Sequence, residues 1–101
     1  MADTLKQLAK GTLADSNATI YTTPASTTAI VKSIILCNKT SSDATATIKL
    51  DGTNVVAAHN IPANDSLPLQ LTAILETGDL IEGLSGTTDA IDYYISGIEV
   101  V

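Results

Sequence analysis

Hydrophobic and polar residues along the chain follow the pattern of short strands separated by turns about every 8–12 positions, typical of an all-β sandwich or barrel. The clearest alternation covers residues 44–50, where Ala, Ala, Ile and Leu occupy one parity and Thr, Thr and Lys occupy the other. Residues 29–38 are hydrophobic on both parities, which predicts a strand in the middle of a sheet. The same pattern predicts further strands over residues 18–23, 55–61, 66–71, 80–82 and 90–101. We therefore expect one β-sandwich of about eight short antiparallel strands, either jelly-roll or immunoglobulin-like.

Three local signals add detail to this pattern. Asp51-Gly52 predicts a two-residue hairpin turn, because a type I′ turn needs positive φ and glycine adopts it without strain. Pro68 cannot donate to a sheet ladder, so the strand that contains it is expected at a sheet edge. Gly97 lies where the hydrophobic parity changes between Ile95 and Ile98, and we expect a β-bulge there.

The opening residues have a different pattern. Leu5 and Leu8 are three positions apart and Gly11 follows, which permits one helical turn with a glycine stop. An extended arm is equally compatible with this segment, because chain ends are usually loose unless they are tied down. We therefore divide the chain into residues 1–17, an N-terminal arm with a first short strand, and residues 18–101, the β-sandwich domain.

The composition fits one small domain with an aliphatic core. The chain has 101 residues, of which 45% are hydrophobic, and it contains three Tyr but no Trp or Phe. A chain of this length can build one modest core, and Ile, Leu, Val and Ala must fill it. Cys37 is the single cysteine, so no intramolecular disulfide is possible.

The charge balance excludes several classes of partner. The net charge is −6 and arginine is absent; residues 51–101 hold eight of the eleven acidic residues and no Lys or Arg. Nucleic-acid binding needs a basic stripe and anionic membranes need clustered Lys or Arg, so neither is an expected partner. The first residues lack the apolar stretch of a secretory signal, which predicts a protein made in a cytoplasm.

No constellation of residues indicates catalysis. His59 is the single histidine and stands apart from any nucleophile motif, so we expect it to face solvent at a strand end. Cys37 sits in an apolar run, where cysteine usually behaves as a small buried hydrophobe. Glu76, Asp79 and Glu82 flank a turn and are expected to face water. We therefore expect no catalytic residue, no cofactor and no metal site, and we predict that the protein is not an enzyme.

The sequence resembles small structural proteins of tailed bacteriophages. The resemblance is carried by residues 5–11 (LKQLAKG), 20–34 (IYTTPASTTAIVKSI) and 36–38 (LCN). It continues through residues 50–52 (LDG), 61–66 (IPANDS), 75–79 (LETGD) and 95–100 (ISGIEV), and so covers nearly the whole chain. The resemblance implies a virion component of β-sandwich fold, and more specifically a head decoration (cement) protein that binds and stabilises the shell.

The resemblance also implies partners. They are the phage major capsid protein or another virion protein, together with copies of this chain, for which a trimer is favoured. Decoration proteins must be soluble before assembly, and a net negative charge suits that requirement. The locally basic, amphipathic residues Leu5, Lys6, Leu8 and Lys10 are the expected partner contacts; the alternative is a terminus that is disordered or packs on its own domain.

Two alternatives remain open. One is a neck, tail or fibre subunit, which could touch the host surface; receptor binding often uses exposed aromatics, and this chain has only three Tyr. The other is a non-viral carbohydrate-binding sandwich, which usually needs Trp or Tyr stacking platforms.

Overall fold

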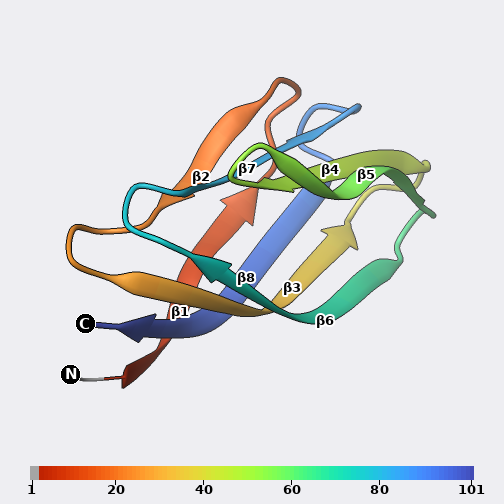
Figure 1. Cartoon of the computed structure of the whole chain (residues 1–101). Helices are drawn as coiled ribbons and strands as arrows, with labels where there is room; N and C mark the ends of the chain where they lie inside the picture. Colours follow the sequence, from red (N-terminus) through yellow and green to blue (C-terminus); the bar gives the residue numbers. More distant parts are fainter. Residues whose placement is uncertain (1–2) are drawn as a thin grey trace.

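The computed structural model describes residues 3–101, which form two packed β-sheets (Figure 1). All eight elements are strands, and every strand pairing is antiparallel. Along the chain they are β1 (Asp3–Thr12), β2 (Ala18–Thr22), β3 (Thr28–Asn38), β4 (Ala44–Leu50), β5 (Thr53–Ile61), β6 (Ser66–Leu75), β7 (Leu80–Ser85) and β8 (Ile91–Val100). The expected all-β sandwich of eight short strands is confirmed.

The strand order is that of a jelly roll. Sheet A has the order β1-β8-β3-β6, and sheet B has the order β2-β7-β4-β5. The first strand therefore pairs with the last, β2 with β7, β3 with β6 and β4 with β5, as in one long hairpin rolled into two layers. Of the two topologies that the sequence left open, this is the jelly roll. Asp3 pairs with Val100, so the two ends of the chain lie side by side.

The core lies between the two sheets and is almost entirely aliphatic. The alternation over residues 44–50 is confirmed, because its four hydrophobic residues are buried and its polar residues point outward. The largest fully buried hydrophobic side chains are Leu13, Val31, Ile34, Leu36, Ile48, Ile61, Leu75, Ile81, Ile91 and Ile95. In each strand, alternate residues face the core, and the residues between them form the outer faces of the two sheets.

Several local expectations are confirmed. Asp51 and Gly52 both have positive φ, at 49° and 81°, as a type I′ hairpin turn requires. Pro68 lies in β6, which is an edge strand of sheet A. The central position of β3 also holds, because β3 has β8 on one side and β6 on the other.

The opening residues form a strand and no helical turn. Residues 3–12 pair with β8 along their whole length, which completes sheet A (Figure 1). The three-residue spacing of Leu5 and Leu8 arises from a register shift between Gln7 and Ala9, which turns Leu8 into the core. Of the two expected conformations the extended one is therefore correct. The division of the chain at residue 17 stays a prediction.

The expectation of a β-bulge at Gly97 is wrong, because β8 is regular there and the register shifts lie in the neighbouring strands. In β8 the side chains alternate regularly: Ile95, Gly97 and Glu99 face the core, so Ile98 points outward. The extra residues are Leu8 in β1 and Lys32 in β3, the strands on either side of β8. A Cβ on Gly97 would collide with the carbonyl oxygen of Ile30, so close backbone approach explains the glycine.

Candidate functional site

The outer face of sheet A carries a continuous row of large aliphatic side chains. Leu5 of β1 pairs with Ile98 of β8, Ile98 pairs with Ile30 of β3, and Ile30 pairs with Ile74 of β6. All four residues belong to the outward parity of their strands. The row therefore crosses the sheet from one edge to the other, and we call it the aliphatic row.

The aliphatic row is open to solvent at both ends. Leu5 is 82% exposed and Ile74 is 64% exposed, while Ile98 and Ile30 between them are half-buried by their neighbours. Burying a Leu or Ile side chain contributes about 1.5–3 kcal/mol. An apolar row of this length on an outer face is therefore a surface that gains free energy when another surface covers it.

A second, shorter apolar group lies farther along the same face. Tyr94 and Ile35 are cross-strand partners, are 43% and 42% exposed, and have Pro68 beside them in β6. A shallow hollow of about 480 Å³ next to Lys10 is lined by Tyr94, Ile35 and Cys37. Four of the six exposed large hydrophobic residues of the described chain are on this one face.

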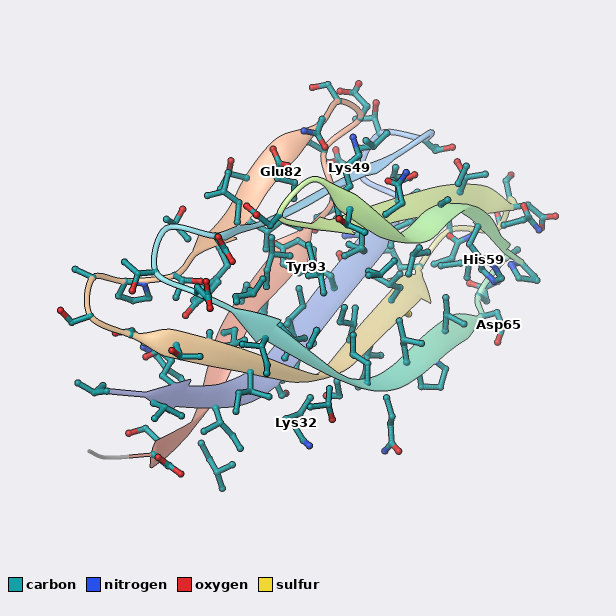
Figure 2. The ribbon with its side chains drawn as sticks, in the orientation of Figure 1. Lys32, Lys49, His59, Asp65, Glu82 and Tyr93 are labelled. Carbon is teal, nitrogen blue, oxygen red and sulfur yellow. The ribbon has the colours of Figure 1, made fainter. Side chains whose placement is uncertain are left out.

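The outer face of sheet B has the opposite character. Its central cross-strand row consists of Thr19, Glu82, Lys49 and Asn54. Figure 2 shows Lys49 and Glu82 on the outside of sheet B, whereas Lys32 points away from the opposite side of the molecule. The two outer faces therefore differ in kind, because one is mainly polar and the other carries the aliphatic row.

The charged residues are also distributed unevenly between the outer face of sheet A and the rest of the protein. The ionisable residues on the outer face of sheet A or at its rim are Asp3, Lys10, Lys32, Lys39, Glu76 and Asp92. This face thus holds three of the five lysines and three of the eleven acidic residues. Most of the acidic residues lie elsewhere on the protein.

Asp92 and Lys39 form an ion pair at the rim of the hollow. Lys39 Nζ lies 2.9 Å from Asp92 Oδ1, and Thr12 Oγ1 donates to the same carboxylate oxygen at 2.7 Å. The Thr12 hydrogen bond, followed by that from Lys39, lowers the pKa of Asp92 below its ordinary value. Both partners of the ion pair are about half exposed, so the pair contributes little to stability.

The four expected partner contacts all lie on β1, but they point in different directions. Leu5 and Lys10 point outward on the face that carries the aliphatic row. Lys6 lies 3.1 Å from Glu99 at the end of the sandwich, and Leu8 belongs to the core with 8% exposure. The structure thus brings two of the four onto one surface, and whether they contact a partner stays a prediction.

The residues that could have carried chemistry are spread over the molecule. His59 is exposed on β5, as expected. Cys37 is half-buried and faces outward between Asp92 and Ser66, so the expectation of a core cysteine is wrong. Glu82 lies on the outer face of sheet B, apart from the turn that contains Asp79.

Residues 3–101 contain neither a candidate metal centre nor a candidate membrane-spanning helix. The described chain contains no group of three His, Cys, Asp or Glu side chains that could hold a metal ion. It also contains no helix with the length and apolar character needed to cross a membrane.

Sequence reasoning did not identify three members of the aliphatic row, namely Ile30, Ile74 and Ile98. Two signals pointed to Ile30 and Ile98, and none pointed to Ile74. Residues 29–38 are apolar on both parities, and Ile98 follows the opposite parity from Ile95. Each signal predicts an apolar residue on an outer face when the strand itself is regular.

No protein-family model matches the sequence, and no curated protein matches it. Three solved structures have a similar arrangement of strands. An exo-β-1,3-galactanase from Phanerochaete chrysosporium is 15% identical with a TM-score of 0.46 over 96% of this chain, which spans 26% of that enzyme. The Drosophila NLP core, whose structure concerns pentamer formation and histone binding, is 10% identical with a TM-score of 0.47 over 99% of this chain and 97% of that one. A pentameric capsid protein from metagenomic phage sequences is 19% identical with a TM-score of 0.44 over 92% of this chain and 61% of that one. At these values we draw no functional argument from the neighbours.

Proposed function

We propose that this protein is a non-enzymatic structural subunit of a tailed-phage virion, and more specifically a head decoration (cement) protein. The sequence resemblance, which runs over nearly the whole chain, supports this class of protein. The observation that supports the proposal most directly is the aliphatic row on the outer face of sheet A. It gives the domain one face suited to assembly.

The distribution of charge fits this role. Before assembly a decoration protein must stay soluble at high copy number, and a net charge of −6 serves that need. During assembly it must present a surface that gains free energy when it is covered. The outer face of sheet A meets this second requirement while carrying three of the eleven acidic residues.

We propose that this face, with Leu5 and Lys10 on it, is an assembly surface, and that the partners of the protein in the virion are the major capsid protein or another virion protein together with further copies of this chain. Leu8 then supports β1 from the core and Lys6 holds its end against Glu99. Contact through a strand that stays in place avoids the cost of removing Leu8 from the core.

Labelling of intact virions with gold-conjugated antibody against this protein tests the proposal. Label spread over the head is the expected result, because a decoration protein occupies many equivalent sites. Label confined to the neck or tail would replace decoration by the neck, tail or fibre role. Virions without any label would contradict the virion assignment itself.

A further inference from the structure

We propose that the outer face of sheet A binds a second copy of this chain across a two-fold axis parallel to the strands. The inference rests on the proposed function, because it names the partner of the face proposed there for assembly. Three properties of the face support a second copy: its self-complementarity, its charge and its area.

The aliphatic row can pack against the same row of a second copy whose strands lie in the reversed order. A two-fold axis parallel to the strands reverses the order β1-β8-β3-β6 in the second copy, so that β1 faces β6 and β8 faces β3. Leu5 then meets Ile74 of the second copy, and Ile98 meets Ile30 of the second copy. Every strand contributes one large aliphatic side chain, so no position of the row is left opposite a polar residue.

The charge distribution on this face suits self-association. Two copies of a protein with net charge −6 repel each other through most of their surfaces. The outer face of sheet A carries Lys10, Lys32 and Lys39 against Asp3, Glu76 and Asp92, so it is close to neutral. When these faces meet, the acid-rich remainder of each copy points away from the other.

The two Lys10 side chains do not oppose one another in the reversed arrangement. Lys10 is on β1, at the level where Tyr94, Ile35 and Pro68 follow across the sheet. With the strand order reversed, Lys10 lies opposite Pro68 of the second copy. The two Lys10 side chains are then separated by the width of the sheet.

The area of the face is sufficient for a specific contact. Four strands about 4.8 Å apart and about ten residues long, at about 3.3 Å per residue, present roughly 600 Å². Two copies would together bury roughly 1,200 Å², which is the lower end of the range for specific protein interfaces. We therefore expect a reversible dimer of moderate affinity.

Analytical ultracentrifugation of the full chain from about 1 µM to about 500 µM tests the inference. The wild-type protein is expected to convert from monomer to dimer within this range. Leu5→Ser and Ile74→Ser are each expected to raise the dissociation constant about tenfold or more, because they shorten the row at its ends. Both side chains are largely exposed in the monomer, so folding should be unaffected.

Val55→Ser is the matched control. Val55 is an exposed hydrophobic residue, 39% accessible, and borders the seam between β5 and β6 together with Leu67 and Leu69. It lies outside the outer face of sheet A, so this variant should dimerise as the wild type does.

A charge pair tests the predicted orientation. Leu5→Lys and Ile74→Asp should each weaken the dimer, whereas the double variant should regain part of the loss, because both ends of the interface then place a lysine opposite an aspartate. No recovery in the double variant would overturn the reversed arrangement.

A wild-type protein that stays monomeric, that forms a trimer, or whose dimer is weakened equally by Leu5→Ser and Val55→Ser would overturn the two-fold contact. These outcomes leave the virion role intact, since the labelling experiment tests that role separately.

Discussion

Tyr21 donates a hydrogen bond of 2.5 Å to Glu99 and thereby joins sheet B to sheet A. Glu99 is 8% exposed, and its other carboxylate oxygen lies 3.1 Å from Lys6 Nζ. The hydrogen bond from Tyr21 is the main reason why the pKa of Glu99 lies below its ordinary value, although burial opposes the shift. Burial and the neighbouring carboxylate in turn raise the pKa of the Tyr21 phenol. One buried acidic group thus fastens β1, β2 and β8 at the end of the sandwich where the chain begins and ends.

We expect Tyr21→Phe to lower the free energy of unfolding by about 1–2 kcal/mol, because it leaves a buried carboxylate without its strongest donor. Urea denaturation followed by circular dichroism measures the change. Tyr94→Phe is the control, since it removes the same hydroxyl from a residue that is 43% exposed on the outer face of sheet A. Equal stability of the two variants would show that the Tyr21–Glu99 bond does not fasten the sheets.

The lowered pKa of Glu99 predicts a pH dependence of stability. Because its folded-state pKa lies below the ordinary value of 4.5, ionised Glu99 stabilises the fold above that pH. This contribution disappears as the pH falls through the folded-state pKa. Glu99→Gln should therefore be less stable than wild type at about pH 7, by roughly 1–3 kcal/mol, and the gap should narrow below about pH 4.5.

The measurement is a series of denaturation curves for wild type and Glu99→Gln at successive pH values. Glu76→Gln makes the same chemical change at an exposed side chain and serves as the control. A gap between wild type and Glu99→Gln that is constant with pH would rule out ionised Glu99 as its source.

Local pattern was sufficient to predict most of the sandwich. The alternation over residues 44–50 and the Asp51-Gly52 turn are properties of neighbouring residues, so the β4–β5 hairpin follows from the sequence alone. The strand β1 was harder, because the bulge at Leu8 breaks its alternation and creates a spacing of three that also fits a helix.

The candidate site could not be predicted in the same way. The aliphatic row joins four residues that are far apart in the sequence, and it exists only in the strand order and register of sheet A. A one-residue change of register would turn any one of them to the other face. The sequence could supply the outward-facing Leu5 and Lys10 as candidates, but their neighbours depend on tertiary pairing.

Gly97→Ala should lower the free energy of unfolding by about 3 kcal/mol. The new methyl group would collide with the Ile30 carbonyl oxygen and would lie 2.8 Å from Leu8 Cδ1, and backbone cannot move aside as a flexible side chain can. Thermal denaturation measures the loss of stability of Gly97→Ala and of the comparison variant Gly52→Ala. At Gly52 no atom lies within 4 Å, so only the positive φ opposes alanine, at a cost of about 1 kcal/mol. A smaller loss at Gly97 than at Gly52 would contradict the close packing of β8 against β3.

Asn38→Asp should be among the most destabilising conservative changes in the chain. Asn38 is fully buried, and its Nδ2 donates to the carbonyl oxygens of Ser42 and Ile61 at 2.8 and 3.0 Å. Its Oδ1 accepts hydrogen bonds from the backbone N and the Oγ1 of Thr40. An aspartate would set a carboxylate oxygen against two carbonyl oxygens, at a cost of about 3–4 kcal/mol.

Chemical denaturation at neutral pH measures the Asn38→Asp effect. Asn60→Asp is the matched control, because it makes the same change at an exposed position of β5. We expect the control to stay within about 0.5 kcal/mol of wild type. Similar stabilities for both variants would mean that the loop between β3 and β4 does not depend on the Asn38 amide.

Ala58→Gly should raise stability, in contrast to glycine substitutions elsewhere in a strand. Ala58 has a φ of 44°, and it lies in β5 where the pairing with β4 shifts register. The left-handed conformation costs a non-glycine residue about 1–2 kcal/mol, and glycine removes this cost. Part of the resulting stabilisation is lost because glycine makes the unfolded chain more flexible. A net stabilisation of about 0.5 kcal/mol is expected in thermal denaturation. Ala57→Gly, one residue earlier on the same strand, should instead lose about 0.5–1 kcal/mol, and the reverse order would contradict the left-handed conformation of Ala58.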